Sequence, residues 1–80
     1  MATTNTAEAV GYVLREARHA RGLSRLSLGI RLGVSRQRVE QIEKGQACPQ
    51  IETLRRFAKE LGTTASSLLA AAEVQLGERL

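Results

Sequence analysis

The apolar residues of this chain recur at intervals of three and four positions, which is the spacing of one helical face. Five segments show this pattern, and none shows the alternation of apolar and polar residues that is typical of a half-buried strand. The segments cover residues 7–21, 24–32, 36–44, 51–61 and 65–77. The sequence therefore predicts an all-α fold of five helices.

The ends of these segments carry residues that commonly begin or end a helix. Ser24, Ser35 and Thr64 are suitable N-caps because a side-chain hydroxyl can accept a hydrogen bond from a backbone N–H of the first turn. Glycine, which readily adopts the left-handed conformation found just after a helix, occurs at positions 22, 33, 45 and 62. We interpret residues 1–6 as a disordered N-terminal tail and residues 7–80 as one domain.

The charge of the chain favours an acidic partner. Twelve basic residues against eight acidic ones give a net charge of +4 over 80 residues, and a small basic domain of this kind is typical of nucleic-acid binding. Tyr12 and Phe57 are the only aromatic residues, which disfavours binding of single strands by stacking on aromatic rings. No apolar run approaches the roughly 20 residues of a membrane span. A lone cysteine, Cys48, cannot form an internal disulfide and is consistent with a cytoplasmic protein.

The third predicted helix separates two apolar residues from a polar face. At about 100° per residue, Val39 and Ile42 lie opposite Gln37 and its neighbours. Arginine can bind guanine O6 and N7 with two parallel hydrogen bonds, and glutamine can do the same with adenine N6 and N7. Glu40 is four residues from Arg36, so it can hold that guanidinium or accept from cytosine N4. Any exposed helix has a polar face, however. By itself, this face is equally consistent with DNA reading and with an ordinary solvated surface that binds nothing.

The segment LSRLSLGIRLGVSRQRVEQIEKG, residues 23–45, resembles the helix-turn-helix of the Cro and phage-repressor (XRE) family. The matching features are leucines four apart in the second helix, Gly-Val-Ser in the turn, and the closing IEKG. The resemblance extends to LREARHARGLS before the segment and IETLRRFAKELG after it. It implies a lambda-repressor-like DNA-binding domain with its helix-turn-helix at about residues 24–44.

The resemblance implies roles for individual residues. It implies base reading for five residues of the third helix: Arg36, Gln37, Arg38, Glu40 and Gln41. It implies contact with the DNA backbone for four residues: Arg25, Ser35, Lys44 and Gln46. Arg18 and Glu43 match a structural salt bridge of the family. Arg25 stands where the family usually has glutamine, and its charge is expected to strengthen attraction to a phosphate while losing any amide pairing with the third helix.

A domain this small has few base contacts, so proteins of this class bind as symmetric dimers to two half-sites about 34 Å apart. The fifth predicted helix carries an apolar stripe that is wider than one small core requires. We expect Leu68 to belong to the core, and we expect the homodimer interface to contain Leu69, Ala72 and Leu76.

These observations predict a sequence-specific regulator of transcription that binds a palindromic double-stranded DNA operator. A repressor is favoured, and an activator remains an alternative. An antitoxin of a toxin–antitoxin pair and a restriction–modification controller protein remain alternatives, and a toxin or RNA polymerase remains a possible protein partner. No nucleophile and base stand at a catalytic spacing, so an enzyme is disfavoured. His19 lacks a second histidine or a nearby cysteine or aspartate, which disfavours a metal site, and no cofactor is predicted.

Overall fold

The computed structural model of this protein describes residues 5–77 and contains five helices within that range. The helices are α1 (Thr6–Ala20), α2 (Arg25–Leu32), α3 (Arg36–Glu43), α4 (Ile51–Glu60) and α5 (Ala65–Gln75). The described residues include no strand. The prediction of an all-α fold is confirmed, and each predicted helix agrees with the observed one to within two residues at either end.

The first helix begins earlier than the sequence predicted. The side chain of Asn5 accepts a hydrogen bond from the backbone N–H of Glu8 at 2.8 Å, so Asn5 is the N-cap and α1 begins at Thr6. The predicted disordered tail is therefore wrong for residues 5 and 6, because the amide of Asn5 satisfies a backbone group that would otherwise lack a partner. Residues 1–4 of that tail lie outside the described residues, as do residues 78–80 of the predicted domain.

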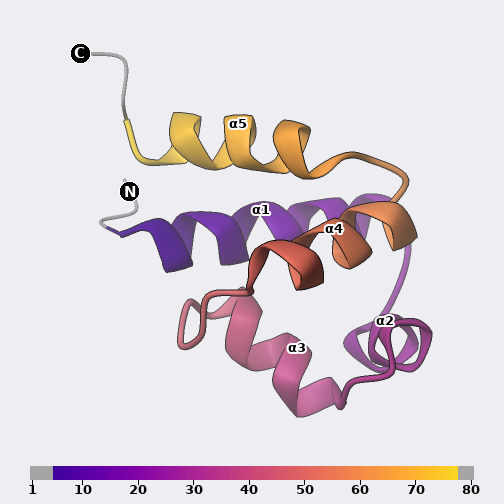
Figure 1. The fold of residues 1–80 in the computed structure, drawn as a ribbon. Coiled ribbons are helices and arrows are strands. Elements are labelled where there is room, and N and C mark those ends of the chain that lie inside the picture. Colours follow the sequence, from indigo (N-terminus) through magenta and orange to yellow (C-terminus); the bar gives the residue numbers. More distant parts are fainter. Residues whose placement is uncertain (1–4, 78–80) are drawn as a thin grey trace.

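A single apolar core joins the helices. Its largest fully buried side chains are Leu14, Leu28, Val39, Ile42 and Phe57. Helix α1 packs against both α5 and α3, whereas α2 packs against α3 and α4. In Figure 1, α5 runs beside α1 on one side, and the α2–turn–α3 unit stands on the other side. No helix within residues 5–77 is both long and apolar enough to cross a bilayer.

The turn between α2 and α3 is held at its α2 end by backbone and side-chain hydrogen bonds. Gly33 has a φ of 73°, a left-handed conformation that suits glycine, and the N–H of Val34 donates to the carbonyl oxygen of Gly29 at 2.9 Å. The guanidinium of Arg56, on α4, donates to the carbonyl oxygen of Leu32. The end of α2 is thereby attached to α4.

Most of the apolar residues of α5 for which the sequence predicts a dimer interface are buried or half-buried within the monomer. Ala72 is only 2% exposed and lies in the core with Leu68, so its assignment to a dimer interface is wrong. The reason is that α1 and α5 lie alongside each other, and a small residue on α5 permits their close approach. Leu76 is half-buried and packs against the same core. Leu69, at 37% exposed, is the one predicted interface residue that remains on the surface.

We expect Gly11→Ala to destabilise the protein by about 1–3 kcal/mol, the usual cost of overpacking a core. Gly11 is buried where α1 crosses the end of α3, and a β-carbon there would lie 2.6 Å from the carbonyl oxygen of Glu43 and closer still to that of Ile42. These backbone atoms cannot move aside without displacing α3. Urea unfolding measures the effect. Glu16→Ala, on the exposed face of the same helix, is the control, and a Gly11→Ala variant as stable as the parent would contradict the close packing.

Candidate nucleic-acid interface

Helix α3 has one buried apolar face and one polar face that reaches solvent. Val39 and Ile42 are 0% and 1% exposed and hold the helix to the core. The five predicted base-reading residues lie away from these anchors: Arg36, Gln37, Arg38 and Gln41 are exposed, and Glu40 is half-buried. The structure thus brings these residues together on one surface, which is the arrangement that reading base edges from a major groove requires.

Ser35 lies at the start of α3 and serves first as its N-cap. Its hydroxyl oxygen accepts a hydrogen bond from the backbone N–H of Arg38 at 3.0 Å. The hydroxyl hydrogen of a serine remains a donor when the oxygen is an acceptor. Ser35 can therefore cap α3 and still make the predicted contact with the DNA backbone, because its hydroxyl hydrogen is available to donate to a phosphate oxygen.

The Arg18–Glu43 salt bridge implied by the resemblance is present and is buried. Arg18 Nε donates to Glu43 Oε2 at 2.6 Å, and Arg18 Nη2 donates to Glu43 Oε1 at 3.0 Å. The two side chains are 7% and 0% exposed. Arg18 Nη1 also donates to the carbonyl oxygen of Leu23 at 2.8 Å. This fork joins the end of α1 and the following loop to the end of α3, so the carboxylate sets how α3 sits on the domain.

Arg25 has a structural role that the sequence did not predict. Its Nε donates to Glu43 Oε1 at 3.0 Å, so one buried carboxylate binds a guanidinium from α1 and another from α2. The side chain of Arg25 remains 30% exposed. The sequence predicts that this charge attracts a phosphate and that the amide pairing with α3 is lost. Instead, arginine at this position bonds to α3 through Glu43.

Lys44 and Glu40 form an exposed ion pair at the far end of the polar face. Lys44, the residue that follows α3, has its Nζ 2.7 Å from Oε2 of Glu40, four positions earlier. The pKa of Glu40 is lowered, chiefly because Lys44 donates a hydrogen bond to it and also adds a positive charge, with smaller contributions from Arg25 and Arg36. The structure thus gives Lys44, rather than Arg36, as the ion-pair partner of Glu40. Gln46 follows α3 and is exposed.

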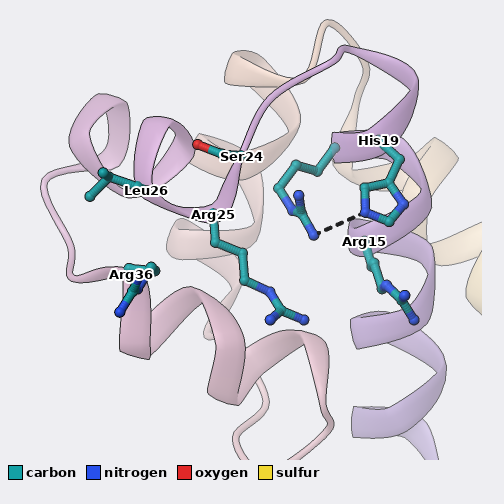
Figure 2. A pocket seen from close by; sticks show the side chains of 7 residues that line it. Arg15, His19, Ser24, Arg25, Leu26 and Arg36 are labelled. Carbon is teal, nitrogen blue, oxygen red and sulfur yellow. Dashed lines mark hydrogen bonds between the residues drawn. The ribbon is translucent and has the colours of Figure 1, made fainter.

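A positively charged depression lies beside α3. Its volume is about 480 Å³, and its lining includes four arginines, which are Arg15, Arg18, Arg25 and Arg36. Figure 2 shows Arg15 and His19 on α1, Arg25 on α2 and Arg36 at the start of α3 around this depression. His19 Nε2 lies 3.3 Å from Arg18 Nη2. Arg18 and Arg25 share the single carboxylate of Glu43, so the four arginines keep a net positive charge, which suits an anion such as a phosphate.

Arg15 and His19 were missed as candidate contacts by reasoning from the sequence. Arg15 precedes Arg18 by three positions on α1, a spacing that places both on one side of the helix. The distribution of charge also indicates that this part of α1 belongs to the basic region. Residues 15–44 hold eight basic and three acidic residues, a balance of 8 − 3 = +5. These side chains of α1 lie beside α2 and α3 because of the way the helices pack. That packing is not visible in the sequence.

The fold and this surface define a helix-turn-helix protein with an accessible polar recognition helix. The helix-turn-helix family matches residues 14–68, which is more than half of the chain. The chain therefore belongs to the helix-turn-helix family, of the Cro and phage-repressor (XRE) type. A comparison with curated protein sequences gives no significant match.

Solved structures share the fold. The clp gene regulator ClgR from Corynebacterium glutamicum superposes with a TM-score of 0.88 at 24% identity, covering 94% of this chain and 80% of that one. The restriction–modification controller protein C.AhdI from Aeromonas hydrophila gives a TM-score of 0.73 at 31% identity, covering 78% of this chain and 94% of that one. Hydroxypropylphosphonic acid epoxidase from S. wedmorenis also matches, with a TM-score of 0.75 at 24% identity over 82% of this chain and 35% of that one. An epoxidase thus contains the same fold, so the fold alone does not determine a function.

Proposed function

We propose that this protein is a sequence-specific, double-stranded DNA-binding regulator of transcription that acts as a repressor in the cytoplasm. Its role is binding rather than catalysis. In this proposal, α3 enters the major groove and its exposed side chains contact base edges. The positively charged depression beside α3 receives a phosphate of the DNA backbone, with Arg25 and Arg15 contributing charge there.

The observation that supports this function best is the exposed face of α3. Arg36, Gln37 and Gln41 carry the donors and acceptors that base edges recognise, and they stand on a helix anchored by two fully buried residues. A rigid helix is favourable for base reading because little conformational freedom is lost when its side chains meet the groove. The similarity to the regulators ClgR and C.AhdI supports the same role.

Selection of bound duplexes from a random DNA pool tests the function. We expect an enriched motif, and we expect it to have two-fold symmetry because two copies of one domain would read two half-sites. Failure to enrich any motif at low salt would contradict sequence-specific DNA binding. Recording the mass in solution by sedimentation, with and without the selected duplex, shows whether the bound form is a dimer.

The dimer in this proposal uses the surface between α4 and α5 rather than the whole apolar stripe of α5. A depression of about 470 Å³ lies there, lined in part by Ile51 and Leu69. Ile51 is 67% exposed and Leu69 is 37% exposed. Two large apolar side chains at one depression favour an apolar partner, and a second copy of the chain is the partner that a symmetric operator needs.

We expect Ile51→Lys combined with Leu69→Lys to shift the protein to a monomer and to weaken operator binding. Paired charges of like sign would face each other across a two-fold interface. Sedimentation measures the first effect and DNA titration the second. Ile30→Lys, an apolar residue of α2 that is 72% exposed and not among those lining this depression, is the control. A double variant that remains dimeric would place the interface elsewhere.

A restriction–modification controller role is a second candidate. The similarity to C.AhdI favours it, since the aligned region covers 94% of that protein at 31% identity. The two candidates share DNA binding and differ in the genes that are regulated. If the selected motif lies upstream of restriction endonuclease or methyltransferase genes in the source genome, the controller role is supported. A motif found only upstream of other genes would contradict it.

A further inference from the structure

The two glutamates of α3 have different surroundings, and this difference bears on specificity. Glu43 is fully buried and bound by Arg18 and Arg25. Glu40 stands on the exposed side, with 36% of its side chain accessible. It is therefore the carboxylate of α3 that would face DNA. A carboxylate in a groove meets the negative charge of the phosphates, so Glu40 is an unfavourable residue there unless something offsets its charge.

In the free protein, Lys44 offsets the charge of Glu40. Their 2.7 Å contact is a short, charge-assisted hydrogen bond. Lys44 is also the C-cap residue of α3 and is 52% exposed. Its flexible side chain could instead reach a phosphate at the edge of the groove. When the ammonium group of Lys44 moves to a phosphate, Glu40 loses its main partner. Arg25 and Arg36 lower the pKa of Glu40 less than Lys44 does.

Resting on the proposed DNA-binding function, we propose that the Glu40–Lys44 ion pair determines specificity by making two contacts depend on each other. Where the DNA presents a cytosine amino group to Glu40, the carboxylate accepts from it and Lys44 moves to a phosphate. Where no amino group is presented, Lys44 stays on Glu40 and the phosphate contact is not made. Glu40 thus lowers the affinity for unrelated DNA more than it lowers the affinity for the operator.

Glu40→Gln tests this mechanism because it removes the charge and keeps the size of the side chain. The ammonium group of Lys44 is then free to contact a phosphate whatever the DNA sequence. We expect binding to a scrambled duplex to strengthen and the preference for the selected duplex to fall by about 5- to 150-fold, the range associated with one base-pair position. We also expect the slope of log K against log salt on the scrambled duplex to steepen by about 0.9, as for one added phosphate contact.

A double-mutant cycle separates this mechanism from simple charge repulsion. If the ion pair acts as proposed, Glu40→Gln strengthens binding to the scrambled duplex more in the parent than in a Lys44→Gln background, where it relieves only the repulsion between Glu40 and the phosphates. Glu16→Gln removes one negative charge from the exposed face of α1 and is the control for the change in net charge. Thermal unfolding of each variant shows that the fold is retained.

Three outcomes would overturn the mechanism. The first is an equal gain in both Lys44 backgrounds, which would indicate repulsion alone. The second is an unchanged preference for the selected duplex in Glu40→Gln. The third is a parent protein that enriches no duplex, which would overturn the proposed function as well. The first two require a parent that binds specifically, so they reject the ion-pair mechanism while leaving DNA binding in place.

Discussion

Replacing Arg36 and Gln37 together by alanine is expected to abolish discrimination between the operator and unrelated DNA while leaving the fold intact. Both side chains are exposed on α3, so their removal leaves no cavity in the core. One good bidentate contact to a base is worth about 1–3 kcal/mol of discrimination, so two lost contacts reduce the preference by about 30-fold to 10⁴-fold. Titration of selected and scrambled duplexes measures the ratio, and circular dichroism measures the fold.

A matched variant separates base reading from charge. Arg36→Lys combined with Gln37→Ala keeps the net charge but replaces a planar fork by a single ammonium group. We expect it to retain affinity for unrelated DNA, with an unchanged salt slope, and still to lose discrimination. If either double variant discriminated as well as the parent, the assignment of these two residues as base readers would be wrong.

Removing the carboxylate of Glu43 is expected to have the largest effect on stability. In Glu43→Ala, Arg18 would keep a charge at a site that is only 7% exposed, and Arg25 would lose its ion-pair partner. Breaking a buried ion pair from one side costs about 3–5 kcal/mol. A domain of this length is stable by roughly 4–12 kcal/mol, so we expect a marked fall in the urea midpoint. We also expect weaker DNA binding, because α3 loses its attachment to α1 and α2.

Two further variants test the cause of that loss. Glu52→Ala removes an exposed carboxylate of α4 that lies 3.9 Å from Arg55, and its expected effect is within about 0.5 kcal/mol. Arg25→Gln removes the outer of the two partners and leaves Arg18 on Glu43, with an expected cost of about 1 kcal/mol. Equal unfolding free energies for Glu43→Ala and Glu52→Ala would show that the buried cluster contributes nothing to stability.

Much of the candidate interface was predictable because it depends on residues close together in the sequence. The polar and apolar faces of α3 follow from helical spacing, and Ser35 and Gly33 define the start of α3 and the turn before it through local backbone chemistry. The Arg18–Glu43 pair spans 25 positions, and it was expected only because the segment resembles a known family. Periodicity and capping alone give no information about which distant side chains meet.

The sequence by itself determined the five helices, their order and the polar face of α3, because each depends on interactions within a few residues. The tertiary structure decided which sides of those helices are covered. It placed Ala72 in the core beside α1, gave Glu43 a second partner in Arg25, and gathered arginines from three helices around one depression. The physical reason is that the packing of one helix on another depends on shape and charge over residues far apart in the chain, and a single helix cannot specify it.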